Sequence, residues 1–161
     1  MKIFLIGFMG SGKSTLGKEL AEKLNLSYIE ADMLIEQQSG MTIPDIFSKE
    51  GEAHFRILEK NLLQHLQLAD QCVIATGGGM PCHHQNIDTM NRLGMTIWLD
   101  VDEEVLVERL ENQKAHRPLL FHTADLKTQI HQLLQERQSY YEKAKYKVRN
   151  PDLEKVLAIL K

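Results

Sequence analysis

The 161-residue sequence predicts an α/β fold built around a parallel sheet, and two observations carry this prediction. First, a phosphate-binding loop motif lies directly between a strand-like run and a helix-like run. Second, short strand-like runs recur along the chain and alternate with helical patterns, which is typical of parallel strands covered by helices. The expected strands are 2–6, 26–29, 72–75, 95–99 and 146–148.

The motif occupies residues 7–15 and matches the P-loop pattern G-x-x-x-x-G-K-[ST] in full. Its glycines let backbone N–H groups turn toward phosphate oxygens, and the next helix directs its positive end at the same place. Lys13 suits the β- and γ-phosphates, and the Ser14 hydroxyl is placed to bind Mg²⁺. We therefore expect a nucleotide site formed by Gly10, Ser11, Gly12, Lys13, Ser14 and Thr15.

Composition limits the classes of function. The net charge of −3 provides no bulk attraction for nucleic acid, so we expect no nucleic-acid partner. No apolar run reaches membrane-spanning length, so no membrane partner is expected. Two cysteines are too few for a disulfide framework, which favours the reducing cytoplasm. The length fits one domain, residues 1–161.

Helical patterns fill the gaps between the expected strands. Residues 16–24 repeat leucine at every fourth position, and residues 42–45 combine a threonine N-cap, an early proline and an acidic residue, which is typical of a helix start. Residues 102–104 have the same acidic character. The periodicity fails from 111 to 124, between two helices, so this segment is expected to be a mobile excursion.

Two helical stretches carry charges where their pattern calls for apolar residues. Glu59 lies inside the apolar stripe of 55–66 with Arg56 at its edge, and Arg137 lies near the centre of the stripe of 126–141. One interpretation is structural: Arg56 pairs with glutamates at the surface, and Arg137 extends to the protein edge. Beside a nucleotide loop we favour a polar cavity for an anionic second substrate, because guanidinium groups suit carboxylates and phosphates.

Glycines and carboxylates mark the edge of the sheet where α/β proteins bind ligands. Gly77, Gly78 and Gly79 follow a strand and allow close approach by a ligand, although a plain loop is the alternative. Glu30 and Asp32 follow another strand. Asp32 is suited to accept a hydroxyl proton or to hold Mg²⁺ through water, and the alternative for it is a helix N-cap.

Residues 81–84 contain one cysteine and two histidines, which are potential metal ligands. Nothing elsewhere completes a tetrahedral set at standard spacing. A solvated loop that leads into a helix is therefore the favoured interpretation.

Together these motifs resemble the shikimate kinase family over nearly all 161 residues. In the family's order they are the P-loop, the acidic stretch 30–32, Asp45-Ile46-Phe47, Gly51-Glu52 with Phe55-Arg56 and Glu59, the triple glycine, Arg117-Pro118-Leu119-Leu120, and Arg137 with Tyr141. The resemblance implies a P-loop kinase core of three αβα layers with a five-stranded parallel sheet. It adds a helical substrate-binding region at about 32–60 and a lid at about 111–124.

The resemblance also implies an activity. The chain would transfer the γ-phosphoryl group of ATP, with Mg²⁺, to the 3-hydroxyl of shikimate in aromatic amino-acid biosynthesis, and would act as a monomer. Asp32 would hold the acceptor hydroxyl, while Lys13 and Arg117 would contact the transferring phosphates. The shikimate pocket would comprise Asp32, Phe47, Phe55, Arg56, Glu59, Gly77, Gly78, Gly79 and Arg137.

The remaining implied contacts concern adenine and the metal. Arg109 and Pro151 fall where the family holds adenine. Ser14 would bind Mg²⁺, with Glu30 and Asp32 acting through water. The chain departs from the family at Glu30, which is one methylene longer than the usual aspartate, so that Glu30 would act from a shifted position.

Two rival functions stay open from the sequence. The first is another small-molecule kinase, acting on gluconate or a nucleotide, but the inward arginines and the triple glycine favour an anionic, polyhydroxylated acceptor. The second is a nucleotide-dependent switch without catalysis. Such a switch would be expected to lose Asp32 or Arg117, and this chain keeps both.

Overall fold

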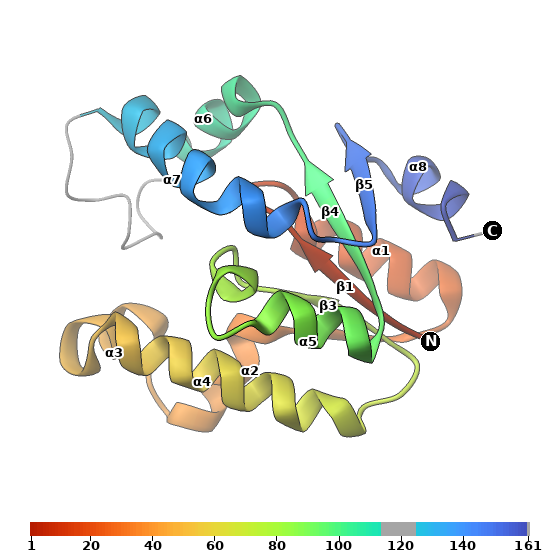
Figure 1. The fold of residues 1–161 in the computed structure, drawn as a ribbon, viewed down its shortest axis with the longest axis horizontal. Helices are drawn as coiled ribbons and strands as arrows, with labels where there is room; N and C mark the ends of the chain where they lie inside the picture. The colour runs from red at the N-terminus through yellow and green to blue at the C-terminus, as the bar shows by residue number, and fades with distance from the viewer. Residues whose placement is uncertain (114–124, 161) are drawn as a thin grey trace.

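The computed structural model describes residues 1–113 and 125–160. Within them, five parallel strands form one sheet in the order β2-β3-β1-β4-β5 (Figure 1). The strands are β1 (Lys2–Ile6), β2 (Ser27–Glu30), β3 (Cys72–Ala75), β4 (Met95–Asp100) and β5 (Tyr146–Arg149). All five predicted strands are confirmed, and none of their ends is displaced by more than one residue.

Helices cover both faces of this sheet, which confirms the predicted αβα layers (Figure 1). The α-helices of the described residues are α1 (Lys13–Leu24), α2 (Ala31–Ser39), α3 (Ile43–Glu50), α4 (Glu52–His65), α5 (Asn86–Leu93), α6 (Glu103–Glu111), α7 (Leu126–Tyr141) and α8 (Leu153–Ala158). Single 3₁₀ turns, η1 (Leu66–Leu68) and η2 (Met80–Cys82), follow α4 and precede α5.

The alternation of side chains along each strand divides the core into two layers. In β1, Ile3 and Leu5 pack with α1 and α8, whereas Phe4 and Ile6 pack with the helices of the other face. Both sets are fully buried. Because both faces of the central strands are covered, these strands are continuously apolar, as parallel sheets require.

The predicted helix starts are confirmed. The Thr42 hydroxyl caps α3 by accepting a hydrogen bond from the backbone N–H of Asp45 at 3.3 Å. Helix α6 begins after Asp102 and has Glu103 and Glu104 in its first turn, where carboxylates favour the positive end of the helix.

Two sequence expectations need comment. Residues 114–124 lie outside the described residues, and so do Arg117 and most of the predicted lid. The expectation of a solvated loop at 81–84 is wrong for its beginning, because Pro81 is buried in η2 and only His84 of these residues is exposed. Within the described residues, no three His, Cys, Asp or Glu side chains gather as a metal site would require.

No helix in the described part of the chain has the length and apolar character needed to cross a membrane.

The register of the sheet determines where the functional loops meet. Ala75, at the end of β3, pairs with Leu5 of β1 on one side and with Glu30 of β2 on the other. The P-loop, the triple glycine and the start of α2 therefore leave the sheet side by side at its carboxyl edge, where open α/β sheets bind ligands.

Candidate active site

The P-loop has the backbone geometry that its glycines predict. Gly10 and Gly12 adopt φ angles of +79° and +91°, a left-handed conformation that other residues rarely adopt. Lys13 lies across the loop, and its Nζ donates to the carbonyl oxygens of Gly7 at 2.9 Å and of Phe8 at 2.8 Å. The ammonium group is buried at the centre of the loop as a result.

Helix α1 presents its N-terminus to the same place. Gly12 caps it without a side chain, and its first turn contains no acidic residue. The positive end of the helix therefore has no counter-charge of its own, and it favours an anion in front of it.

A large cavity of about 680 Å³ opens over this loop. All predicted nucleotide-binding residues in the described part of the chain line it: Gly10, Ser11, Gly12, Lys13, Ser14, Thr15, Arg109 and Pro151. The P-loop lysine and the helix N-terminus make this cavity suited to the phosphates of a nucleotide.

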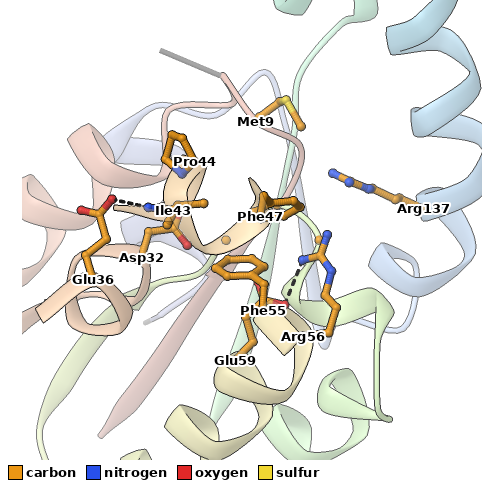
Figure 2. A pocket seen from close by; sticks show the side chains of 13 residues that line it. Met9, Asp32, Glu36, Ile43, Pro44, Phe47, Phe55, Arg56, Glu59 and Arg137 are labelled. Carbon is orange, nitrogen blue, oxygen red and sulfur yellow. Dashed lines mark hydrogen bonds and ion pairs between the residues drawn. The ribbon is translucent and has the colours of Figure 1, made fainter. Parts of the chain in front are cut away.

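A smaller cavity of about 200 Å³ lies beside the first, among α2, α3, α4, the triple glycine and α7 (Figure 2). All the residues predicted for the acceptor pocket line it: Asp32, Phe47, Phe55, Arg56, Glu59, Gly77, Gly78, Gly79 and Arg137. The structure thus brings together side chains from five separate segments that the sequence assigned to one pocket.

Arg56 is held in this cavity by two carboxylates. It is 4% exposed and donates to Glu59 at 2.9 Å, a bond drawn in Figure 2, and to Glu52 at 2.9 Å. The interpretation in which Arg56 pairs with glutamates at the surface is therefore right about its partners and wrong about its position. Holding the guanidinium before a ligand arrives reduces the entropy lost on binding.

Glu59 carries an electrostatic cost at this position. It is 1% exposed, and burial raises the pKa of its carboxyl to about 7, although the Arg56 guanidinium acts in the opposite direction. Its Oε1 atom has no hydrogen-bond partner among the described residues.

Arg137 reaches toward the same cavity from α7 (Figure 2). It is 7% exposed, so the interpretation that it extends to the protein edge is wrong. Its guanidinium lies 5.5 Å from the centre of the Phe8 ring, and its Nη1 atom has no hydrogen-bond partner among the described residues. A buried donor without a partner is costly, and an anionic ligand would satisfy it.

The triple glycine is required by the neighbouring side chains of the site. A Cβ atom at Gly77 would lie 2.9 Å from Asp32 Oδ1, and one at Gly79 would lie 2.6 Å from both terminal nitrogens of Arg56. A Cβ at Gly78 would lie 3.1 Å from the Met9 amide nitrogen. The three glycines therefore allow the loop to lie close to Asp32, Arg56 and Met9, all of which line the small cavity.

Asp32 lies where the two cavities meet. It belongs to the first turn of α2, whose N-cap is Glu30, so the N-cap alternative for Asp32 is wrong. It lines both the large and the small cavity, together with Met9, Gly77 and Gly78. A carboxylate at this boundary is suited to interact with groups from either side.

The large cavity also contains oxygen donors that fit Mg²⁺. The Ser14 hydroxyl and the carboxylates of Glu30 and Asp32 all line it, next to the phosphate-binding loop. Mg²⁺ prefers oxygen ligands, keeps several waters and is usually held by one or two carboxylates together with substrate phosphates. The donor set of this chain fits that pattern. Glu30 is also engaged within the protein, because it accepts a hydrogen bond from the Tyr28 hydroxyl.

The residues predicted to contact adenine also line the large cavity. Arg109, on α6, donates from Nη1 to the carbonyl oxygen of Gly10 at 3.0 Å. Pro151 lies in the loop between β5 and α8 and lines the same cavity. The structure therefore brings both predicted residues to one nucleotide-sized space.

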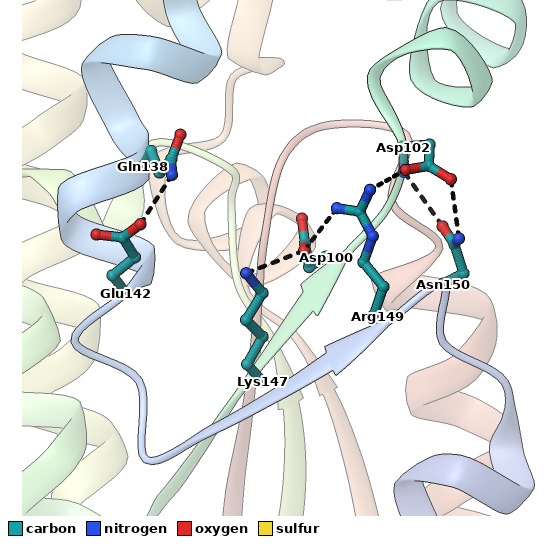
Figure 3. Close-up of polar contacts among 7 residues, drawn as sticks. All are labelled: Asp100, Asp102, Gln138, Glu142, Lys147, Arg149 and Asn150. Atoms are coloured by element: carbon teal, nitrogen blue, oxygen red, sulfur yellow. Dashed lines mark hydrogen bonds and ion pairs between the residues drawn. The ribbon is translucent and has the colours of Figure 1, made fainter.

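A polar network holds the loop that carries Pro151 (Figure 3). Arg149 pairs with Asp100 at 2.8 Å and also with Asp102, and Asn150 donates to Asp102 at 2.9 Å. The backbone N–H of Asn150 donates to the Asp100 carbonyl at 2.7 Å. These contacts join the ends of β4 and β5 and position the loop beside the cavity.

Several residues of the site were not predicted. Met9, Glu36, Ile43 and Pro44 also line the small cavity. Glu36 accepts a hydrogen bond from the Ile43 amide at 2.9 Å and so joins α2 to the start of α3. Their sequence signals, a helical glutamate and an ordinary helix start, do not separate them from structural residues.

Comparison with known proteins agrees with this geometry. The sequence pattern of the family described as shikimate kinase matches residues 9–160. A shikimate kinase of Bacteroides fragilis is 45% identical over 148 residues, which cover 91% of this chain and 83% of the relative. A shikimate kinase of Bacteroides thetaiotaomicron is 42% identical over 156 residues, which cover 96% of this chain and 89% of the relative.

Solved structures are similar throughout. The 1.7 Å crystal structure of a Bacteroides thetaiotaomicron shikimate kinase aligns with a TM-score of 0.89 at 39% identity and covers 98% of this chain and 93% of its own. A shikimate kinase of Acinetobacter baumannii in complex with shikimate aligns with a TM-score of 0.89 at 35% identity, covering 99% of this chain and 89% of its own. With the family pattern, the close relatives and the shared fold in agreement, the chain belongs to the shikimate kinase family.

Proposed function

We propose that this chain transfers the γ-phosphoryl group of ATP to the 3-hydroxyl of shikimate, giving shikimate 3-phosphate and ADP. The observation that carries the proposal is the common wall of the two cavities, formed by Met9, Asp32, Gly77 and Gly78. On one side of this wall lies a phosphate-binding loop, and on the other lie two buried arginines. A phosphoryl donor and an anionic acceptor would meet there.

The arginines are assigned to the carboxylate of the acceptor. Arg56 and Arg137 are both nearly buried and line the same small cavity. Guanidinium groups bind carboxylates with paired hydrogen bonds, which fixes orientation as well as position. Phe47 and Phe55, whose rings lie 4.9 Å apart, form an apolar wall for the carbon ring of the acceptor.

Asp32 is assigned to the acceptor hydroxyl. From the boundary of the two cavities its carboxylate would hold the hydroxyl in line with the transferring phosphoryl group and accept its proton. The contribution expected of such a group is positional, because phosphoryl transfer depends mainly on alignment and charge neutralisation.

The phosphate side is assigned to the P-loop. Its backbone N–H groups and Lys13 would bind the β- and γ-phosphates, and Arg117, which lies outside the described residues, would add a further positive charge. Ser14 would hold Mg²⁺, with Glu30 and Asp32 acting through water. Bound Mg²⁺ neutralises negative charge on the phosphates during transfer.

The proposal also covers the domain organisation, the compartment and the oligomeric state of the chain. Residues 1–161 form one kinase domain, with a substrate-binding region at about 32–60 and a lid at about 111–124. A cytoplasmic monomer is proposed, because side chains of a single chain line both cavities and because Cys72 and Cys82 are both free thiols.

A coupled ADP-release assay tests this function. Mg·ATP is supplied with shikimate, gluconate or a nucleoside monophosphate in separate reactions. We expect ADP release with shikimate alone, and mass spectrometry of that reaction should detect shikimate 3-phosphate. Release that depends on gluconate or on a nucleoside monophosphate, with none for shikimate, would assign the acceptor pocket to a different substrate.

A further inference from the structure

Tyr28 lies in β2 near the proposed metal site, although nothing in the sequence marks it as a functional residue. It precedes Glu30 by two residues in β2, and residues two apart along a strand point to the same face of the sheet. That face is the one covered by α1. A Cβ atom at Gly17 of α1 would lie 2.8 Å from the Tyr28 ring, so the ring packs directly on the helix backbone.

The Tyr28 hydroxyl contacts one of the proposed Mg²⁺ groups. It donates a hydrogen bond to the Glu30 carboxylate. A phenol carries one proton, so this bond uses the single donor of Tyr28.

The bond from the Tyr28 hydroxyl bears on cation binding, because its acceptor Glu30 lines the large cavity, as Ser14 does. The same hydroxyl restricts Glu30, whose longer side chain has more rotamers to lose than an aspartate would have. Partners behind metal ligands commonly orient them and strengthen binding.

We propose that Tyr28 is a positioning residue for the divalent cation of this enzyme, acting through its hydroxyl on Glu30. The inference rests on the proposed function only in assigning Glu30 to the cation of Mg·ATP.

The test is Tyr28→Phe, which removes the hydroxyl and keeps the ring that packs on α1. Mn²⁺ binding is measured by electron paramagnetic resonance in the presence of ADP and without any acceptor. ADP affinity is measured separately by calorimetry in excess EDTA. We expect Mn²⁺ affinity to fall by about 10-fold, at the lower end of the effect of removing such a partner, while ADP affinity in EDTA is unchanged.

A control and a double variant separate positioning from general damage. Tyr146→Phe removes a hydroxyl from β5, where the residue is 39% exposed, and should leave Mn²⁺ affinity unchanged. Glu30→Gln should weaken Mn²⁺ binding, and adding Tyr28→Phe to it should produce a smaller further loss than Tyr28→Phe causes alone, because the tyrosine acts through Glu30. Parental Mn²⁺ affinity in Tyr28→Phe, or full additivity in the double variant, would overturn the inference.

These measurements contain no acceptor. If the acceptor were not shikimate, the Mn²⁺ result would be unaffected, so failure of the proposed function and failure of this inference remain distinguishable.

Discussion

Glu59 shows how a single residue of this site combines two opposing effects. Its carboxylate holds Arg56 in place at 2.9 Å, yet it is taken almost completely out of water to do so. Burial raises the pKa of this carboxyl from near 4.5 to about 7, against the influence of Arg56. A buried pair of this kind is weak evidence for stability and stronger evidence for a functional arrangement.

The raised pKa predicts how stability depends on pH. Between about 4.5 and about 7 the folded protein holds the Glu59 proton and the unfolded chain does not, so the free energy of unfolding falls as pH rises through this window. Glu59→Gln removes this component, which is of the order of 1–3 kcal/mol. Denaturant unfolding of both proteins at pH 5, 6, 7 and 8 measures it. A constant difference between the two proteins at all four values would contradict the prediction.

Gly79 makes a second prediction at the scale of one residue. Its Cβ position lies 2.6 Å from the Arg56 guanidinium, which Glu52 and Glu59 hold in place. Gly79→Ala should therefore displace Arg56 and raise the KM for shikimate by roughly 10-fold or more, as expected when a charged hydrogen bond is lost. ATP affinity, measured by calorimetry in the same variant, serves as the internal control. An unchanged KM would show that Arg56 relaxes without cost.

At the scale of elements, strands and helix starts were predictable because their signals are local. Apolar runs mark the central strands, and the Thr42 cap marks α3. Glu59 and Arg137 were predictable as inward charges because each interrupts an apolar stripe, and Arg56 because it lies at the edge of one.

Other features depend on contacts between distant segments. Glu36 lines the acceptor cavity and bonds the Ile43 amide, and the Tyr28 ring lies against Gly17 because α1 packs on β2. The depth of Arg137 was likewise undetermined, since a helical pattern gives the direction of a side chain and not what covers it. Tertiary packing decides these features, so the sequence alone could not predict them.

A contact between α7 and the triple glycine positions Arg137. Tyr141 is fully buried, one helical turn after Arg137, and its hydroxyl donates to the Gly78 carbonyl at 2.6 Å. Its ring also packs 5.9 Å from that of Trp98. The helix is therefore bonded directly to the loop that forms the other wall of the cavity.

Tyr141→Phe tests this contact. Removing the hydroxyl leaves the partly buried Gly78 carbonyl without this bond, which should cost about 1 kcal/mol of unfolding free energy. Because this contact also positions Arg137, shikimate affinity should weaken while ATP affinity is retained. Denaturant unfolding and calorimetric titration measure the two effects. Tyr140→Phe, one residue away and 37% exposed, is the matched control and should change neither quantity. If the two variants behaved alike, the contact between Tyr141 and Gly78 would not contribute to shikimate binding.

At the scale of the whole molecule, the sheet creates the site by bringing three chain segments to one edge. Ala75 pairs with Leu5 and with Glu30, so the P-loop, the triple glycine and α2 emerge together. This arrangement forms the common wall between the nucleotide and acceptor cavities. In the proposed function each cavity receives its own ligand, and the two ligands meet at Asp32.

Asp32→Asn tests whether Asp32 contributes to turnover rather than to ligand affinity. Asparagine keeps the size of the side chain and removes its ability to accept a proton, so kcat should fall by about 10²–10⁴-fold, the usual contribution of a general base. ATP and shikimate affinities should change by less than about 3-fold, because the P-loop, Arg56 and Arg137, which are assigned most of the charged contacts to the two ligands, are unchanged. Steady-state kinetics and calorimetry measure these quantities, and thermal unfolding confirms that the fold is kept.

The matched control is Asp88→Asn, which removes an exposed carboxylate from the first turn of α5 as Asp32→Asn does from α2. It should retain full turnover. If Asp32→Asn also turned over normally, then alignment by the arginines and the P-loop would be sufficient for transfer, and the carboxylate at the boundary would serve only to hold the metal or the fold. A large loss of kcat with both affinities intact would instead assign the chemistry to the point where the two cavities meet.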